Sequence, residues 1–355
     1  MRDLIDVSDR REDPAALRAM MRRDGYIFLR RLLNRSDVEG VRCALLHAIA
    51  AHHWLAEGSA PLEARPDPVE RIENTDPYWG GAHAVQSLEC FHQLAHDKRL
   101  VETMEALIGE QVLVHPRKIP RIIWPNQDDR ITPPHQDFTH VGGTVDFFTC
   151  WIPLSDCPAR QGGLCVLPGS QIGGVRPMEQ ASGAGATRSL VDSDAHDWAT
   201  IGYEAGDVLI FHSMTVHASM ANRTDRLRLS MDCRYQPISE PVTRWSLGPF
   251  FYQGIMRQHG RSIEKLPPWS EFAAGWSSTE WIEAPAKAIA IDAGSMSPAA
   301  AHAGSQRGQS RFVDTSTFVE QLRDARPSAT VWSVAGRPRV RDGHPGVKRG
   351  RGSGQ

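Results

Sequence analysis

A pattern of metal-binding residue types lies near the middle of the chain. The pattern consists of the segment Pro134-His135-Gln136-Asp137 and, far downstream, His217. In a strand, residues two apart project to the same side, so His135 and Asp137 can reach one metal while Gln136 points away. His217 would complete a set of two imidazoles and one carboxylate, which is typical of open non-haem iron(II) sites. A closed structural zinc site would need four protein ligands.

The His-x-Asp spacing is a weak signal by itself. About one such triplet is expected by chance in a chain with this much histidine, and it occurs once here. The competing interpretation is a hydrogen-bonded pair beside a turn. The context favours a metal site, because the triplet follows a Pro-Pro pair, precedes strand-like segments and is matched by a later His and Arg.

An arginine soon after the second histidine supplies what an acidic co-substrate would need. A planar guanidinium can bind a carboxylate, such as the distal carboxylate of 2-oxoglutarate, through two charge-assisted hydrogen bonds. Arg228 alternates with Leu227 and Leu229, so we expect it to face inward while the leucines pack against flanking helices. Arg223 and Arg226 compete for this role, but they lie in a polar turn and are expected to be solvated.

Other histidines are better explained without a metal. His92 and His96 would share a helix face, but a zinc peptidase motif needs Glu where Gln93 stands. We interpret both as ordinary helix residues near the core. His212 is a rival ligand to a lesser degree, and His140 is expected in or near the pocket. The candidates for substrate contact are His140, Arg121 and Phe138.

Two parts with different periodicities must position these residues. Residues 14–55 have helical spacing interrupted by a short strand at 26–29, and residues 87–109 are again helical. Residues 58–82 are rich in Pro, Gly and Asp and are expected to be a loop. From residue 111 onward, short strand-like runs alternate with turn signals. The runs cover residues 112–115, 121–124, 146–152, 164–167, 207–211 and 228–235.

Helices followed by many short strands predict an α+β fold. We expect a double-stranded β-helix (a cupin-like jelly roll) at 111–240, flanked by the N-terminal helical part at 14–109. Both would belong to one catalytic domain spanning 1–283. Residues 284–310 are dominated by Ala, Gly and Ser and predict a flexible linker. Residues 311–355 predict a short helix and a basic, disordered tail.

Composition restricts the classes of partner. The 355 residues carry a formal net charge of −2, which favours neither nucleic acid nor an anionic membrane. None of the six cysteines forms a C-x-x-C motif, and the N-terminus lacks an apolar signal core. We therefore expect a cytoplasmic protein that acts on a small molecule, and the oligomeric state stays open.

Several ordered motifs resemble those of the phytanoyl-CoA dioxygenase family of Fe(II)/2-oxoglutarate oxygenases. The resemblance covers roughly residues 15–280. The matching segments are His135-Gln136-Asp137, Trp151-Ile-Pro-Leu-Ser-Asp, Gly162-Gly-Leu-Cys-Val-Leu-Pro-Gly-Ser170, Gly206-Asp-Val-Leu-Ile-Phe and His217-Ala-Ser219 through Arg228. As an ordered set they are far more specific than the triplet alone.

The resemblance implies roles for individual residues. His135, Asp137 and His217 would be the ligands of Fe(II). The co-substrate 2-oxoglutarate, which reacts together with O2, would be bound by the group Arg228, Ser219 and Trp151. The family also uses a residue on the strand before the triplet, for which Arg121 and Lys118 are both candidates, on opposite faces.

The intact carboxylate narrows the expected chemistry. Related halogenases replace this carboxylate with a small residue, whereas Asp137 is present here. Hydroxylation of an unactivated C–H bond of a small molecule, such as a specialised metabolite, is therefore the main prediction. Desaturation, ring formation and acyl-CoA hydroxylation are alternatives. A catalytically silent binding homologue, or a hydrolase or isomerase using zinc or manganese, also stays open.

Overall fold

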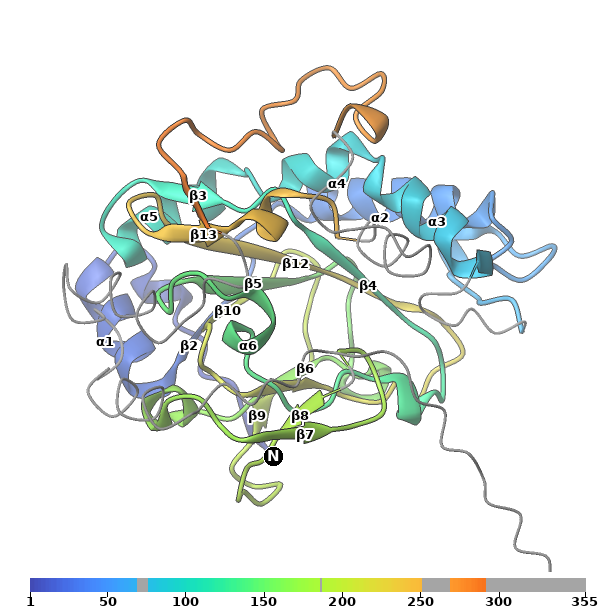
Figure 1. Cartoon of the computed structure of the whole chain (residues 1–355). Helices are drawn as coiled ribbons and strands as arrows, with labels where there is room; N and C mark the ends of the chain where they lie inside the picture. The colour runs from blue at the N-terminus through green and yellow to red at the C-terminus, as the bar shows by residue number, and fades with distance from the viewer. Residues whose placement is uncertain (69–75, 186, 251–268, 292–355) are drawn as a thin grey trace, which may run out of the picture.

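The computed structural model describes residues 1–68, 76–185, 187–250 and 269–291. Helices lie on the outer side of a larger β-sheet, and a smaller sheet faces the other side of that sheet (Figure 1). The fold is thus a mixed α/β arrangement with mostly antiparallel strands, and its layers place the inner faces of the sheets toward one another.

The larger sheet has six strands and forms the middle layer. Its order is β2-β10-β5-β12-β3, and β4 also pairs with β12. The strands are β2 (Tyr26–Leu29), β3 (Val112–Val114), β4 (Ile119–Ile123), β5 (Phe148–Pro153), β10 (Val208–His212) and β12 (Arg228–Pro237). All of these pairs are antiparallel. The strands predicted from the sequence are therefore confirmed to within a few residues.

The smaller sheet has four strands in the order β1-β9-β6-β11. They are β1 (Arg2–Asp3), β6 (Leu164–Val166), β9 (Ala199–Thr200) and β11 (His217–Ser219), and a separate hairpin joins β7 (Met178–Gln180) to β8 (Thr187–Ser189). The N-terminal part is not purely flanking, because β1 and β2 each form the edge of a sheet.

The helical layer differs in detail from the prediction. The helices are α1 (Pro14–Asp24), α2 (Arg35–Ala50), α3 (Asp76–Gln86), α4 (Glu89–Leu94), α5 (Lys98–Ile108) and the short α6 (Phe138–Val141). Short 3-10 helices occupy Ser8–Arg10, Pro61–Glu63, Asp128–Arg130, Ala159–Gln161, Ser170–Gly173, Arg244–Leu247 and Trp269–Glu271. No helix in the described part of the chain is long and apolar enough to cross a membrane.

Two local expectations about the helices are corrected. The single helix expected at 87–109 is divided, because the Asp97 side chain accepts a hydrogen bond from the backbone N–H of Arg99 and starts α5 anew. The loop expected at 58–82 contains the beginning of α3. Gly109 caps the C-terminal end of α5 with a left-handed φ of 90°, so the helical region ends where the sequence predicted.

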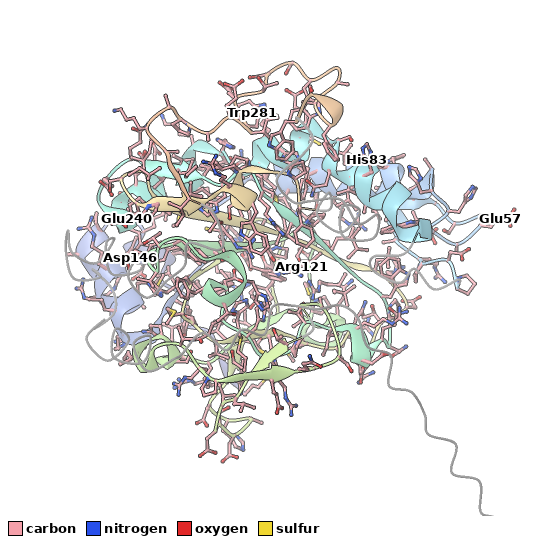
Figure 2. All side chains as sticks on the ribbon, in the orientation of Figure 1. Glu57, His83, Arg121, Asp146, Glu240 and Trp281 are labelled. Carbon is pink, nitrogen blue, oxygen red and sulfur yellow. The ribbon has the colours of Figure 1, made fainter. Side chains whose placement is uncertain are left out.

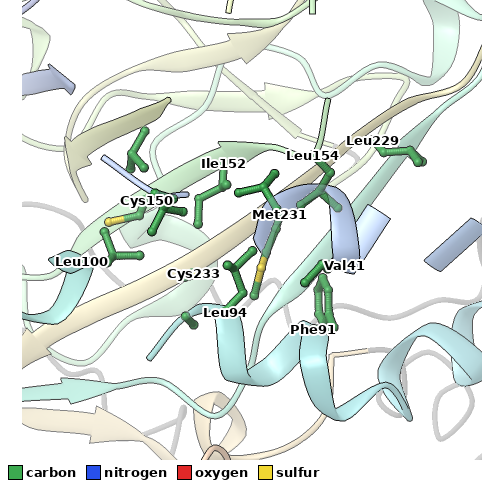
Figure 3. Packing of buried hydrophobic residues seen from close by; sticks show 14 of the residues in the cluster. Val41, Phe91, Leu94, Leu100, Cys150, Ile152, Leu154, Leu229, Met231 and Cys233 are labelled. Carbon is green, nitrogen blue, oxygen red and sulfur yellow. The ribbon is translucent and has the colours of Figure 1, made fainter. Parts of the chain in front are cut away.

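The main hydrophobic core fills the space between the helices and the outer face of the larger sheet. Figure 3 shows Cys150 and Ile152 of β5 beside Met231 of β12, with Phe91 and Leu94 of α4 packed against them. A second cluster lies between the two sheets and includes Trp151 from β5 and Val166 from β6. Alternation along β5 thus supplies both cores.

The inner face of β12 is polar instead of apolar. Arg228, Ser230, Asp232, Arg234 and Gln236 are all buried, although none belongs to a hydrophobic cluster. The residues between them pack into the main core. The predicted inward orientation of Arg228 follows from this alternation, which lines one half of the space between the sheets with charged and hydroxyl groups.

The start of the predicted linker is ordered. Strand β14 (Ile289–Ile291) pairs in parallel with β13 (Pro241–Thr243), so the flexible range expected at 284–310 is wrong for these three residues. Isoleucine favours strands, and the run of small residues hid this signal. Residues 292–310 of that range and the predicted tail at 311–355 lie outside the described residues.

Candidate functional site

The two histidines of the predicted triad are joined through their backbones. His135 and His217 form an antiparallel bridge in which each N–H donates to the other's carbonyl oxygen at 3.0 Å. Their rings lie side by side with centroids 4.1 Å apart. The bridge extends the pairing of β11 and thereby unites two segments that are distant in the chain.

Asp137 reaches the same point from the N-cap position of α6. Its backbone is helical (φ −60°, ψ −30°), so the expectation that His135 and Asp137 share a strand is wrong. The ligand atoms of Asp137 and the two histidines nevertheless lie within 4.8 Å of one another. Among the described residues this is the single group of three or more potential metal ligands.

The hydrogen bonds of the histidines orient their free nitrogens. Nδ1 of His135 lies 2.9 Å from the carbonyl oxygen of Pro133, and Nδ1 of His217 lies 3.0 Å from that of Thr215. These contacts assign the ring proton to Nδ1 and leave Nε2 as a lone-pair donor. Burial lowers the pKa of His217 to about 3, so its imidazole is neutral at pH 7.

The two oxygens of the Asp137 carboxylate have different neighbours. Oδ1 lies 3.5 Å from Nε2 of His135 and 3.7 Å from Nε2 of His217. Oδ2 accepts hydrogen bonds from Thr149 and Arg234. Burial would raise the pKa of Asp137, but opposing effects, of which the positive charge of Arg234 is the largest, hold the pKa well below the usual range. Two imidazole nitrogens and one anionic oxygen therefore converge, which fits a divalent cation.

Arg228 lies in the same interior but lacks an acidic partner. Its side chain donates to the carbonyl oxygen of Gly162 (3.0 Å) and to the hydroxyls of Ser230 (2.7 Å) and Ser219 (3.2 Å). Within the described residues, no carboxylate forms an ion pair with it, although it is only 1% exposed. Burial lowers its pKa, yet a guanidinium stays charged. Such a cation is suited to an anionic ligand.

Trp151 borders this cation. The guanidinium carbon of Arg228 lies 5.8 Å from the centre of the Trp151 ring. The indole Nε1 of Trp151 is buried and has no hydrogen-bond partner within the described part of the chain. The structure thus brings together Arg228, Ser219 and Trp151, the three residues expected around 2-oxoglutarate, and a buried donor and a cation remain for an acceptor to use.

The two candidates on the strand before the triplet are separated by β4. Arg121 lies on the inner side, where its Nε donates to Asp232 at 2.8 Å, and Figure 2 places it near the centre of the molecule. Lys118 lies on the helical side, where Nζ donates to the carbonyl oxygen of Trp281 at 2.5 Å and approaches Nε2 of His96 at 3.3 Å. Arg121 is therefore the candidate that shares the interior with Arg228.

A pocket opens along β4 beside this interior. It is lined by Arg121, Ile123, Trp124, Thr132, Ala184 and Phe250, among others. The carbonyl oxygen of Thr132 accepts a hydrogen bond from the backbone N–H of Ser219. This bond connects the pocket wall to β11, the strand that carries His217. The lining combines aromatic and aliphatic surface with a few polar groups, as sites for small molecules do.

The other predicted substrate contacts have different surroundings. The His140 ring stands edge-on to His135 at 5.4 Å, and burial lowers the pKa of His140 to about 4. Phe138 packs in an apolar cluster with Phe147 and Met214. Contact with substrate stays a prediction for both residues.

The interpretations of the remaining histidines and arginines can now be compared with the structure. His92 is fully buried and stacks on Trp276 at 5.0 Å, which confirms a role in packing. His212 lies on β10, with Nε2 3.5 Å from Asp146, and is not part of the metal-ligand group. Arg223 and Arg226 are confirmed as solvated, with side chains 53% and 49% exposed.

Sequence reasoning missed Arg234 and Thr149. The alternation that identified Arg228 continues along β12 and puts Arg234 on the same face. That signal was available in the sequence. The contact with Asp137 was not, because it depends on how α6 is placed against the larger sheet.

The chain is similar to proteins of one known family. The family model described as phytanoyl-CoA dioxygenase (PhyH) matches residues 21–230. The 1-deoxypentalenic acid 11-beta-hydroxylase of Streptomyces exfoliatus is 29% identical over 255 residues, covering 67% of this chain and 86% of the relative. The enzyme of the same name from Streptomyces arenae is 27% identical over 264 residues, with the same coverage.

A solved structure of the epimerase SnoN, in complex with Fe3+, alpha ketoglutarate and nogalamycin RO, is 24% identical. The superposition covers 65% of this chain and 87% of the SnoN chain, with a TM-score of 0.46. The family match extends over more than half of the chain and includes the triad and Arg228. The resemblance inferred from the motifs is confirmed: this chain belongs to the phytanoyl-CoA dioxygenase family.

Proposed function

We propose that this protein is a non-haem Fe(II)/2-oxoglutarate-dependent dioxygenase that hydroxylates an unactivated C–H bond of a small specialised metabolite. One observation carries the proposal. A buried triad of two histidines and one carboxylate shares its interior with Arg228, a buried cation that has no carboxylate partner among the described residues. This is the pairing of metal site and anion site that such a reaction needs.

The residues divide the work between metal and co-substrate. His135, Asp137 and His217 would hold Fe(II), and Arg228 and Ser219 would hold the distal carboxylate of 2-oxoglutarate beside Trp151. Bound iron and 2-oxoglutarate supply the oxidising power: O2 is consumed, 2-oxoglutarate becomes succinate and CO2, and the substrate gains a hydroxyl group.

The protein contributes position, charge and exclusion of water. The triad and Arg228 are all at most 5% exposed, so reacting groups are held in a mostly dehydrated interior. Arg121 lines the pocket along β4, and the ring of His140 lies 5.4 Å from that of His135. We propose both as substrate contacts, with Phe138 supporting the wall behind them.

The substrate class is inferred from the pocket and from the relatives. Two bacterial relatives are named hydroxylases of 1-deoxypentalenic acid. A pocket that combines aromatic and aliphatic side chains with the cationic Arg121 and Arg130 suits a small natural product that carries a polar or acidic group. Desaturation or ring formation would use the same site and differ only in the product. An acyl-CoA substrate is a further alternative for the same centre.

We also propose how the chain is organised around this function. Residues 1–283 would form the catalytic unit, with a double-stranded β-helix as its core. The two facing sheets, joined by the apolar cluster that contains Trp151 and Val166, support this architecture. Because Fe(II) oxidises readily, we place the reaction in the reducing cytoplasm.

The test is succinate formation by the purified protein supplied with Fe(II), 2-oxoglutarate, O2 and a panel of terpenoid and polyketide acids. Asp137→Ala should abolish succinate release, whereas Asp129→Ala, at an exposed carboxylate, should not change it. An active Asp137→Ala enzyme would contradict the ligand assignment. Tight binding of zinc without any consumption of 2-oxoglutarate would favour a hydrolase, and metal binding with no turnover would favour a silent homologue.

A further inference from the structure

The two oxygens of Asp137 have unlike surroundings. Oδ1 faces the space between the histidines and lies 3.5 Å and 3.7 Å from their Nε2 atoms. Oδ2 accepts from Thr149 Oγ1 at 2.5 Å, from Arg234 Nη2 at 3.0 Å and from Arg234 Nε at 3.2 Å. One oxygen is therefore free for a metal, while three donors occupy the other.

These donors come from neighbouring positions in the larger sheet. Thr149 of β5 lies directly opposite Arg234 of β12 in the strand register. Both side chains point into the space between the sheets, and both are buried, at 1% and 3% exposure. Two paired strands of the sheet thus supply the donors, whereas Asp137 itself is the N-cap residue of a four-residue helix.

Arg234 is committed to this contact. Within the described residues its ion pair is with Asp137, and the two side chains are 4% and 3% exposed. Charge-assisted hydrogen bonds between a guanidinium and a carboxylate in such a dehydrated setting are strong and directional. The Oδ2 atom is consequently held away from the histidines.

We infer that Arg234 and Thr149 are positioning residues that limit Asp137 to a single metal-binding oxygen. The inference rests on the proposed function. An octahedral ion held by three protein atoms has three positions left, of which 2-oxoglutarate would use two and O2 the third. If Asp137 used both oxygens, the position for O2 would be lost. By holding Oδ2 in their hydrogen bonds, Arg234 and Thr149 would keep that position open.

The inference can be tested without turnover, with Mn(II) as the probe. Paramagnetic relaxation of solvent protons counts the exchangeable waters on bound Mn(II), before and after 2-oxoglutarate is added. The variants are Arg234→Gln, Arg234→Lys and Thr149→Val, and Arg188→Gln on the exposed β7–β8 hairpin is the matched control. Calorimetry would report the Mn(II) affinity of each.

We expect Arg234→Gln to bind Mn(II) at least as tightly as the native protein but with about one water fewer, because the released Oδ2 can join the coordination sphere. Arg234→Lys should restore part of the native number of bound waters, because the positive charge remains and the ammonium group can donate one hydrogen bond to Oδ2. Thr149→Val removes one donor at similar volume and should give an intermediate count. The control should match the native protein.

An unchanged water count in Arg234→Gln, together with weaker Mn(II) binding, would overturn the inference and leave Arg234 a structural residue. If Arg234→Gln does not fold, the Thr149→Val count decides in the same way. Failure of the proposed function has a different signature. The native protein would then bind Mn(II) but lose no water on addition of 2-oxoglutarate, while the Arg234 effect on the first count would persist.

Discussion

Arg228 and Arg234 lie on the same face of the same strand, yet their charges are compensated differently. Arg234 is paired with Asp137, a carboxylate of the protein itself. Arg228 has hydroxyl and carbonyl partners and no ion pair among the described residues. Both are nearly inaccessible, at 1% and 3% exposure. A buried charge without a counter-charge is costly, so Arg228 identifies the place where an anion from outside is expected.

The difference teaches how one strand can serve two ligands. At one end of the inner face of β12, the guanidinium of Arg234 is paired with Asp137, a predicted metal ligand. At the other end, the guanidinium of Arg228 remains available to an anionic ligand. Arg121 and Asp232 lie between them as an internal ion pair, with a contact of 2.8 Å, and add no net charge. The positive potential is therefore concentrated near Arg228.

The largest expected effect concerns the stability of the metal-free protein. Arg234→Met should lower the free energy of unfolding by about 3–5 kcal/mol, because it leaves the carboxylate of Asp137 buried and unpaired. Arg228→Met should cost less, because only neutral partners lose their donor. Urea denaturation of both variants measures the difference. Equal losses would show that the two arginines are compensated alike and would remove the basis of the comparison.

The second prediction concerns the affinity for 2-oxoglutarate. Arg228→Gln should weaken its binding to the Mn(II)-loaded protein by about 2–3 kcal/mol, or roughly 30- to 150-fold, because a charge-assisted hydrogen-bond pair is lost. Isothermal calorimetry under exclusion of O2 provides the measurement. Arg223→Gln serves as the control, since that side chain is 53% exposed. Native affinity in Arg228→Gln would mean that another cation binds the distal carboxylate.

A third buried cation extends the comparison, because an ammonium group can lose its charge. Burial lowers the pKa of Lys118 from 10.5 to about 7. Between these values the unfolded chain holds a proton that the folded protein lacks, so stability should rise with pH from about 7 toward 10.5. Below pH 7 the full penalty for burying the charge remains.

Thermal or urea unfolding of the native protein and of Lys118→Met, between pH 7 and 10, would measure this contribution. The native protein should gain at most about 1.4 kcal/mol per pH unit from this group, and the variant should lack that gain. Identical pH profiles would indicate that Lys118 stays charged, like the two arginines, and that its contact with the Trp281 carbonyl suffices.

The smallest expected effect tests the hydroxyl beside Arg228. Ser219→Ala should weaken binding of 2-oxoglutarate by about 1 kcal/mol, roughly fivefold, because it removes one neutral hydrogen-bond partner. Ser230→Ala is the informative companion, since that hydroxyl also accepts from Arg228, at 2.7 Å. If only Ser230→Ala weakens the binding of 2-oxoglutarate, the hydroxyl of Ser219 does not contribute to this site, and the prediction is wrong.

Much of this protein follows from its sequence alone. The types and order of His135, Asp137, His217 and Arg228 predicted the site that the structure assembles. Strand alternation predicted which face Arg228 uses, because side chains of successive strand residues point to opposite sides. Residue chemistry and short-range periodicity are local properties, and local properties can be read from a sequence.

Tertiary structure decided what depends on contacts between distant segments. It separated Arg121 from Lys118, which the sequence left as alternatives, by placing one in the space between the two sheets and the other under the helical layer. It placed Asp137 on a helical turn instead of a strand. It also brought Thr149 and Arg234 together around one carboxylate oxygen. Such partnerships arise from the register of paired strands and the packing of α6, which no local pattern encodes.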